Sequence, residues 1–250
     1  MTLKGDLKAG MTVIGTWCAS GSPVVLDIMS SFEQWDFIVL DAEHGPIDAV
    51  VAHSLLRTKK WGQLVRIENG GDYWTIKKYL DMGADGVIVP RVESGYAMRA
   101  IQVAAFYPPE GRRGLGYSPS NMYGIEIQNA PKASNQNVVV IPQIESNAGI
   151  LNLPVILEEG PDAAMIGPWD LTADMGIPGK WNHNSYLKTL EYFLKECQRT
   201  KVPPGIHIPD FSPDKVLEMK KMGFRFLVFA LDLSMLTWAC EYGIKRLMEE

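Results

Sequence analysis

Eight short apolar segments alternate with amphipathic segments along the 250-residue sequence, and this alternation constrains the fold more than any other feature. Most of the apolar segments are four to seven residues long without polar alternation, which is typical of parallel strands buried on both faces. Helices are expected between them, most clearly at 72–82, 95–105, 186–199 and 213–222. The predicted strands lie at 12–17, 36–40, 63–67, 86–89, 138–144, 163–166, 204–208 and 226–230.

About eight βα units in a chain of this length is the number that a (β/α)8 barrel, or TIM barrel, requires. An open, doubly wound sheet usually has a glycine-rich turn after its first strand, and neither G-x-G-x-x-G nor G-x-x-x-x-G-K-[ST] occurs here. We therefore predict an α/β protein in which residues 1–250 form a single TIM-barrel domain. One long irregular segment is expected at 107–137, and a loop of that length is commonly functional or mobile.

The composition argues against several classes of partner. The chain has 24 Lys and Arg against 29 Asp and Glu, a net charge of −5, which gives it no basis for binding nucleic acid. Its apolar runs fall far short of the ~20 residues that span a bilayer, and its start lacks the apolar stretch of a signal peptide. Its three widely spaced cysteines fit neither a disulfide framework nor a zinc site. We expect a cytoplasmic protein that acts on a small molecule, with neither nucleic acid nor membrane as a partner.

Polar residues follow the predicted strands at the end where a TIM barrel carries its active site. No strand end supplies a lysine for a Schiff base, and no serine or cysteine is framed as a nucleophile. In chain order these strand-end residues are Asp41, Glu43, His44, Arg66, Gln143, Glu145, Asp170, His207 and Asp232.

Glu145 and Asp170 follow adjacent strands and can converge on one point. Two carboxylates with open positions suit Mg²⁺ or Mn²⁺, which prefer oxygen ligands and can polarise a carbonyl group. The alternative is that each carboxylate caps the helix that follows it. A strand-end arginine and a strand-end histidine nearby favour the metal site.

His44 lies at a strand terminus between Glu43 and Gly45, a setting that favours exposure in a cleft over a hydrogen-bonded position in the core. An imidazole there can exchange a proton near neutral pH. Arg66 ends an apolar strand and is expected to pair with a buried anion or an enolate. Of the remaining histidines, His53 and His183 are expected in structural or solvent-facing positions, and the role of His207 stays open.

Five segments resemble the HpcH/HpaI aldolase family of metal-dependent, pyruvate-specific class II aldolases, and the resemblance extends over nearly the whole chain. No single segment is decisive, but all five occur in the right order and at the right separations. They are 37–46 (FIVLDAEHGP), 86–93 (GVIVPRVE), 107–116 (YPPEGRRGLG), 142–146 (PQIES) and 160–172 (GPDAAMIGPWDLT).

This resemblance implies a lyase that reversibly cleaves a 4-hydroxy-2-oxo acid to pyruvate and an aldehyde, through a pyruvate enolate held by a divalent metal ion. Glu145 and Asp170 would hold the ion, which would be Mg²⁺ or Mn²⁺, with Co²⁺ as a further candidate. Arg66 would stabilise the enolate oxygen and Gln143 would line the same pocket. Backbone N–H groups of Trp169 and Asp170 would bind the substrate carboxylate.

The resemblance also implies acid–base catalysis by His44, with a partner carboxylate at Asp81 supplied by a neighbouring subunit. It implies a homo-oligomer, with a hexamer expected, in which the C-terminal helix at about 232–249 packs across a dimer interface. The apolar, amphipathic stretch at 233–248 is compatible with this arrangement.

Two residues depart from the family pattern. Trp169 stands where a small residue is usual, and His207 stands where an aliphatic residue commonly lines the aldehyde pocket. Both can narrow, redirect or abolish the use of an aldehyde. Two alternatives therefore stay open: a metal-dependent decarboxylase of 2-oxo acids such as oxaloacetate on the same site, and a non-catalytic 2-oxo-acid binding protein.

Overall fold

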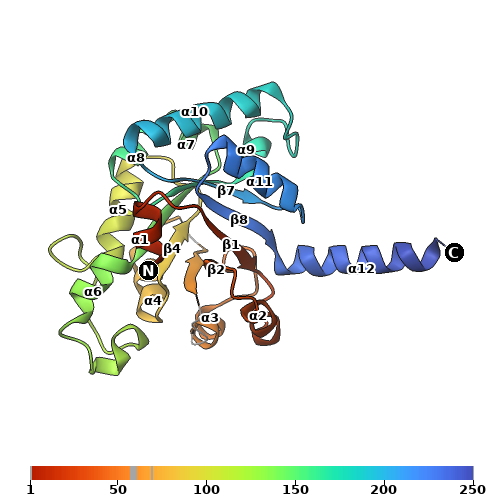
Figure 1. Cartoon of the computed structure of the whole chain (residues 1–250). Helices are drawn as coiled ribbons and strands as arrows, with labels where there is room; N and C mark the ends of the chain where they lie inside the picture. Colours follow the sequence, from red (N-terminus) through yellow and green to blue (C-terminus); the bar gives the residue numbers. More distant parts are fainter. Residues whose placement is uncertain (1, 57–60, 69, 250) are drawn as a thin grey trace.

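The computed structural model describes residues 2–56, 61–68 and 70–249, and its strands form a closed parallel barrel (Figure 1). Each strand pairs with the next in the sequence, and β8 closes the barrel against β1. The predicted TIM barrel is confirmed, and every predicted strand is present within a residue of its expected bounds. The strands are β1 (Val13–Cys18), β2 (Phe37–Asp41), β3 (Gly62–Arg66), β4 (Gly86–Val89), β5 (Val139–Ile144), β6 (Ala164–Ile166), β7 (Pro204–Ile208) and β8 (Phe226–Leu231).

Helices cover the outside of the barrel, and the four clearest predicted helices are all present. Local sequence sets their ends: Asp72 caps α4 by accepting from the backbone N–H of Thr75, and α11 stops at Gly223, whose φ of 115° favours glycine. The helices are α1 (Leu3–Lys8), α2 (Pro23–Ser30), α3 (Ala49–Leu55), α4 (Tyr73–Asp81), α5 (Gly95–Ala105), α6 (Ala130–Asn137), α7 (Asn147–Leu151), α8 (Leu153–Glu158), α9 (Pro168–Asp174), α10 (Asn184–Thr200), α11 (Pro213–Met222) and α12 (Asp232–Met248).

Two apolar cores form because successive side chains of a strand point to opposite faces. One core lies between the strands and the surrounding helices, and the other fills the barrel interior. In the interior, Phe37 and Phe226 stack with ring centroids 4.4 Å apart. Leu3 and Leu7 of α1 join this inner core, so α1 closes the N-terminal end of the barrel and leaves the C-terminal end for chemistry.

The segment at 107–137 is more ordered than expected. It contains the 3₁₀ helix η1 (Pro119–Gly124) and helix α6, so the prediction of one irregular loop is wrong over these residues. The segment connects α5 to β5 and contacts α1, which places it at the N-terminal end of the barrel. It therefore does not close over the C-terminal strand ends of its own chain.

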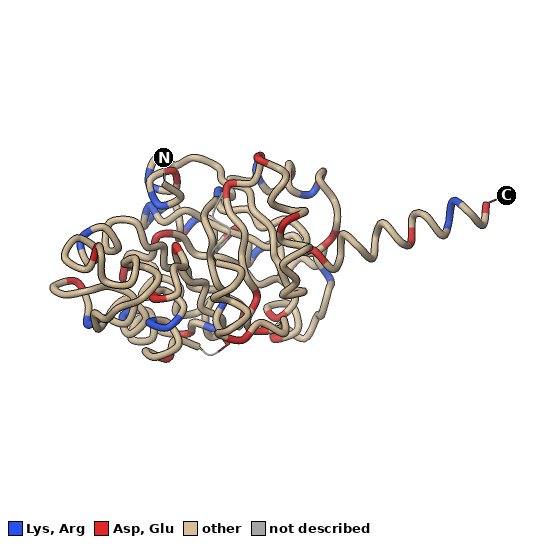
Figure 2. The backbone as a smooth tube through the Cα atoms, turned by 90° about the horizontal axis from the view of Figure 1, so that it is seen from below, with Lys and Arg blue, Asp and Glu red and all other residues tan. Residues whose placement is uncertain are grey.

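Helix α12 leaves the barrel after β8 and projects away from it (Figure 1). Charges of both signs are interspersed over the barrel, whereas most of α12 is uncharged (Figure 2). Among the described residues, no helix has the length and apolarity that a membrane span needs. The exposed large apolar side chains of α12 are Leu233, Leu236, Trp238, Tyr242, Ile244, Leu247 and Met248.

Candidate active site

Arg66 is held rigidly at the C-terminal end of the barrel by a residue of the neighbouring strand. Asp41 and Arg66 are register partners on β2 and β3, so both side chains point into the barrel. Nε of Arg66 donates to Oδ1 of Asp41 at 2.8 Å, and Nη2 donates to Oδ2 at 2.7 Å. This bidentate contact fixes the plane of the buried guanidinium group and leaves its remaining N–H groups available.

Other charges keep Arg66 ionised in this buried position. Burial alone would lower its pKa, but the hydrogen bonds and charge of Asp41, with the charges of Glu43 and Glu145, raise the pKa above its ordinary value. Nε of Arg66 also lies 3.2 Å from Oε2 of Glu43. The guanidinium carbon lies 4.4 Å from the ring centroid of Trp17, a cation–π contact. A fixed positive charge is therefore present inside the barrel.

Glu145 is buried, and both of its carboxylate oxygens are oriented by neighbouring groups. Oε1 accepts from the backbone N–H of Arg91 at 2.7 Å, and Oε2 accepts from the side-chain amide of Gln143. Burial, together with the charges of Asp170 and Glu43, raises the pKa of Glu145 to about 7. A Cβ at Gly167 would lie 2.5 Å from Oε2 of Glu145, so a side chain at this position would displace the carboxylate.

Neither predicted metal carboxylate serves as a helix cap. The N-cap of α7 is Ser146, whose hydroxyl accepts from the backbone N–H of Gly149 at 3.1 Å. The N-cap of α9 is Gly167, and Asp170 lies in the first turn of that helix. The capping alternative is therefore wrong for Glu145, and Asp170 does not occupy the cap position.

The residues at this end fit a divalent cation that also takes ligands from the substrate or from water. Among the described residues, no group of three or more His, Cys, Asp or Glu side chains forms a complete metal cage. Glu145 and Asp170 are nevertheless close enough to raise the pKa of Glu145, and Glu43 joins them electrostatically. Oε1 of Gln143 is buried without a hydrogen-bond partner in the described part of the chain. An oxygen-only donor set with open positions is what Mg²⁺ and Mn²⁺ bind.

A cavity of about 280 Å³ opens where these groups meet, at the C-terminal end of the barrel. It brings together most of the predicted site residues, and Glu145 adjoins it through its hydrogen bond with Gln143. The residues that line it include Trp17, Asp41, His44, Arg66, Gln143, Gly167, Trp169, Asp170 and His207.

His44 and the two departures from the family pattern occupy different parts of this cavity. The His44 side chain is 63% exposed, as its predicted place in a cleft requires, and its Nε2 lies 3.8 Å from Oε2 of Glu43. Trp169 is 52% exposed and packs edge-on against Trp181 at a centroid distance of 4.9 Å, so its indole lies at the rim.

His207 lies deeper than Trp169, against Trp17, with ring centroids 5.5 Å apart. Burial and the positive charge of Arg66 lower the pKa of His207 to about 3, and its backbone partner at Ala230 only partly opposes this shift. The imidazole is therefore neutral at physiological pH. The structure therefore places His207, whose role the sequence left open, inside the cavity as an uncharged group.

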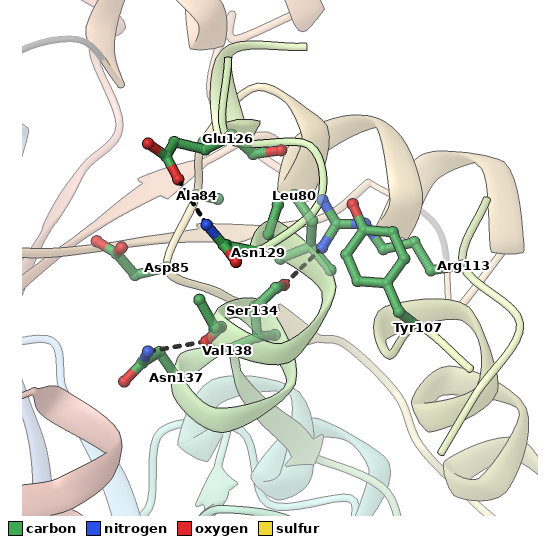
Figure 3. A pocket seen from close by; sticks show the side chains of 14 residues that line it. Leu80, Ala84, Asp85, Tyr107, Arg113, Glu126, Asn129, Ser134, Asn137 and Val138 are labelled. Carbon is green, nitrogen blue, oxygen red and sulfur yellow. Dashed lines mark hydrogen bonds between the residues drawn. The ribbon is translucent and has the colours of Figure 1, made fainter. Parts of the chain in front are cut away.

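Asp81 is the predicted site residue that the structure does not bring to this cavity. It is the last residue of α4 and lies at the N-terminal end of the barrel. Its carboxylate accepts from Nη2 of Arg113 at 2.7 Å and from Nζ of Lys77 at 2.5 Å. Beside it, a second cavity of about 320 Å³ is lined by Arg113, Tyr107 and Ser134, among others (Figure 3). Within one chain, Asp81 cannot serve His44.

Three residues of the site carried no predicted role. Asp41 ends a predicted strand next to Arg66, and knowing the pairing of β2 with β3 would have revealed it. Trp17 is hidden in an apolar run, where nothing distinguishes it from a core residue. Arg91 contributes through its backbone N–H, with a φ of 55°, so its side chain gave no signal.

The fold and site together define a class of protein: a TIM-barrel enzyme whose C-terminal strand ends carry a buried carboxylate, a fixed arginine and a small polar cavity. Comparison with known proteins narrows this class to one family. A model of the HpcH/HpaI aldolase/citrate lyase family matches residues 13–230, and the chain belongs to this family. It is an enzyme of the carbon–carbon lyase class.

Several individual proteins are similar to this chain over most of their length. A hydroxypyruvate/pyruvate aldolase of Roseobacter denitrificans is 30% identical over 241 residues, covering 94% of this chain and 92% of the relative. A 4-hydroxy-2-oxovalerate aldolase of Novosphingobium aromaticivorans is 31% identical over 255 residues, covering 99% and 95%. The crystal structure of an HpcH/HpaI aldolase from Desulfitobacterium hafniense DCB-2 aligns with a TM-score of 0.91 at 27% identity, covering 100% and 98%.

Proposed function

We propose that this lyase cleaves a 4-hydroxy-2-oxo acid to pyruvate and an aldehyde, reversibly, with Mg²⁺ or Mn²⁺ bound by Glu145 and Asp170. The observation that carries the proposal is that Asp170, the adjoining Glu145 and an Arg66 held by Asp41 meet at one cavity. A 2-oxo acid presents a carboxylate and a keto oxygen side by side, and these two groups need a cation and a hydrogen-bond donor. Relatives named as aldolases of pyruvate and of 4-hydroxy-2-oxovalerate support the same chemistry.

Each residue has a defined part in the cleavage. A divalent cation held by Glu145 and Asp170 would supply Lewis-acid chemistry for the keto group. Arg66 donates from the N–H groups that Asp41 leaves open, and it stabilises the negative charge that grows on the keto oxygen as the C3–C4 bond breaks. Gln143 holds Glu145 in place through its side-chain amide. We assign the substrate carboxylate to the backbone N–H groups of Trp169 and Asp170, in the first turn of α9.

His44 is the proposed base that removes the proton of the C4 hydroxyl group in cleavage and returns it in addition. It is the exposed imidazole at the open side of the cavity, whereas His207 stays neutral inside it. Asp81 of a neighbouring subunit is its proposed partner, since Asp81 lies at the wrong end of its own barrel.

This shared site has a direct test. His44→Ala and Asp81→Asn should each be inactive as pure proteins, and their co-assembled mixture should regain activity because some sites then combine an intact His44 with an intact Asp81. If the mixture stays inactive while its subunits demonstrably exchange, Asp81 does not complete a neighbour's site.

The proposed assembly is a homo-oligomer, a hexamer built from dimers, in which α12 packs against a second subunit. Large apolar side chains of α12 are exposed, as are Ile28 of α2 and Phe32, which follows α2. Trp238 contacts Phe211 at a centroid distance of 4.8 Å near the start of α12, and the rest of the helix projects away.

In light scattering, Ile244→Glu should give a smaller assembly than the wild type, and Glu241→Gln should not. An unchanged mass for Ile244→Glu would contradict this use of α12.

The reaction is tested by pyruvate release from 4-hydroxy-2-oxo acids before and after chelation. We expect chelation to abolish release and added Mg²⁺ or Mn²⁺ to restore it. Turnover of oxaloacetate, measured in parallel, should not exceed cleavage of the best hydroxy-oxo acid; a clear excess would identify a decarboxylase instead.

Buried free thiols at Cys18 and Cys197 support our placement of the enzyme in the reducing cytoplasm.

A further inference from the structure

The carboxylate of Asp81 is held by two cationic side chains at the N-terminal end of the barrel. Nε and Nη2 of Arg113 both donate to Oδ1 of Asp81, at 3.1 and 2.7 Å, and Nζ of Lys77 donates to Oδ2 at 2.5 Å. The side chain of Arg113 is only 1% exposed. Charged side chains are almost never buried this deeply unless they are paired, so Arg113 and Asp81 form one unit.

Arg113 is itself fixed by contacts on several sides. Its Nη1 donates to Oγ of Ser134 at 3.1 Å, and its guanidinium carbon lies 4.6 Å from the ring centroid of Tyr107 (Figure 3). Its backbone N–H donates to the carbonyl oxygen of Phe106 at 2.9 Å. A guanidinium group held in this way cannot rotate, and it therefore imposes one orientation on the carboxylate of Asp81.

The segment that carries Arg113 is also attached to the helix that carries Asp81. Tyr73, the first residue of α4, donates from its hydroxyl group to the carbonyl oxygen of Arg112 at 2.9 Å and accepts from the backbone N–H of Gly114 at 3.1 Å. Asp81 is the last residue of the same helix. Contacts at both ends of α4 therefore fix the position of Arg113 relative to Asp81.

Asp81 keeps an open acceptor position in spite of these contacts. Its Oδ1 accepts two hydrogen bonds from Arg113, whereas its Oδ2 accepts only from Lys77 within the described residues. Each carboxylate oxygen has about two acceptor sites, so one site on Oδ2 remains. The side chain of Asp81 is 18% exposed. A group from outside the chain can therefore contact Asp81 without displacing Arg113.

We propose that Arg113 is a positioning residue for catalysis in a neighbouring subunit: it orients Asp81, which in turn orients His44 of that subunit. This inference rests on the proposed shared site. A carboxylate of fixed orientation holds an imidazole ring in one tautomer and one direction, as acid–base catalysis requires. Arg113 lies at the end of its own barrel opposite the active-site cavity and does not line that cavity. Its removal should therefore lower kcat and leave KM unchanged.

The first test is steady-state kinetics of Arg113→Met. We expect kcat to fall about 10- to 100-fold, while KM and the Mn²⁺ dissociation constant stay within about twofold of the wild-type values. Arg113→Lys keeps the charge but not the two parallel N–H groups, so it should recover only part of kcat. Arg112→Met is the matched control, since Arg112 is exposed, and its kcat should equal that of the wild type. A raised KM with an unchanged kcat in Arg113→Met would contradict the proposal.

Mixed assemblies decide whether Arg113 serves its own subunit or a neighbouring one. Arg113→Met co-assembled with His44→Ala should exceed the activity of either pure variant, because some sites then combine an intact His44 with an intact Asp81 and Arg113 of the next chain. Arg113→Met co-assembled with Asp81→Asn should gain nothing, because no chain then carries both Asp81 and Arg113 intact. Recovery with Asp81→Asn, or no recovery with His44→Ala, would overturn the proposal.

The mixture of His44→Ala with Asp81→Asn separates this inference from the proposed function. If that mixture regains activity and the two Arg113→Met mixtures do not follow the expected pattern, the shared site stands and Arg113 has no part in it. If that mixture stays inactive in a demonstrated mixed assembly, the shared site fails and the role of Arg113 fails with it. Should Arg113→Met not fold, Arg113→Lys enters the same mixtures, and a wild-type kcat in Arg113→Lys would refute the positioning role.

Discussion

The two ends of the barrel bury charged groups in different ways. At the N-terminal end, Lys4 donates to the carbonyl oxygen of Val138 at 2.8 Å and lies 3.0 Å from Asp162, so the chain itself completes its contacts. At the C-terminal end, Glu145 has a raised pKa, and polar atoms of Trp17 and His207 lack partners among the described residues. The Lys4 contact stabilises the fold, whereas a buried carboxylate with a raised pKa at a cavity is typical of a functional site.

The largest effect is expected from Glu145→Gln. Removing one of the two proposed cation ligands should lower kcat/KM about 10³-fold and weaken Mn²⁺ binding, because an amide oxygen is a poor substitute for a carboxylate. Steady-state kinetics and a Mn²⁺ titration measure the two effects. The fold should survive, since the change removes charge from a buried and crowded site.

The matched control for Glu145→Gln is Glu158→Gln, which changes an exposed carboxylate on α8. It should leave both measurements at wild-type values. If the kcat/KM of Glu145→Gln were within tenfold of the wild-type value, Glu145 would not be essential, and the active site would not depend on this carboxylate at the C-terminal end.

Arg66→Lys should lower kcat by about 10²-fold with a smaller change in cation affinity. A lysine keeps the charge but cannot make the bidentate contact with Asp41, so the donor to the keto oxygen loses its fixed direction. The comparison of kcat with the Mn²⁺ dissociation constant checks this. Equal losses in both quantities would mean that Arg66 organises the cation site instead.

Lys4→Met should have the opposite profile. It leaves Asp162 in a buried position without its cation, and we expect a loss of about 3 kcal/mol in the free energy of unfolding. Because the contact lies at the N-terminal end, kcat should change by no more than about twofold. Urea denaturation and steady-state kinetics on the same sample test the pair of outcomes. A large fall in kcat without loss of stability would mean that Lys4 serves catalysis, so the two ends of the barrel would not differ in function.

The smallest predicted effect concerns pH. The folded-state pKa of His207, about 3, lies below its ordinary value of 6.5, so only the unfolded chain takes up this proton between those values. The stability that comes from keeping His207 neutral is therefore fully present above pH 6.5 and is lost as the pH falls from 6.5 toward 3. At pH 5 the loss should be about 2 kcal/mol. His207→Leu should lose less stability than the wild type between pH 7 and pH 5, as measured by urea denaturation; identical losses would show that His207 is not held neutral.

The sequence predicted the strands well because eight unbroken apolar runs have few other possible structures. It missed η1 and α6 because that segment lacks an apolar stripe; α6 itself reads APKASNQN. The direction in which α12 leaves the barrel was also beyond prediction, since an amphipathic pattern shows which face is apolar but not what the face packs against.

The candidate site was predictable where it depends on strand ends, and less so where it depends on register. His44, Arg66, Gln143 and Asp170 line one cavity because parallel strands end at the same edge. The contact between Asp41 and Arg66 required the pairing of β2 with β3. The contact between Arg113 and Asp81 required side-chain geometry, which no motif encodes.

The proposed metal-dependent enolate chemistry is tested most directly by proton exchange at the methyl group of pyruvate in D₂O, followed by NMR. Exchange reports enolate formation without any aldehyde, so it isolates the chemistry assigned to the cation site and Arg66. We predict exchange that requires Mg²⁺ or Mn²⁺, stops on chelation and is lost in Glu145→Gln but kept in Glu158→Gln. Exchange that continues without a divalent cation, or pyruvate binding with no exchange at all, would contradict metal-dependent enolate formation at this site.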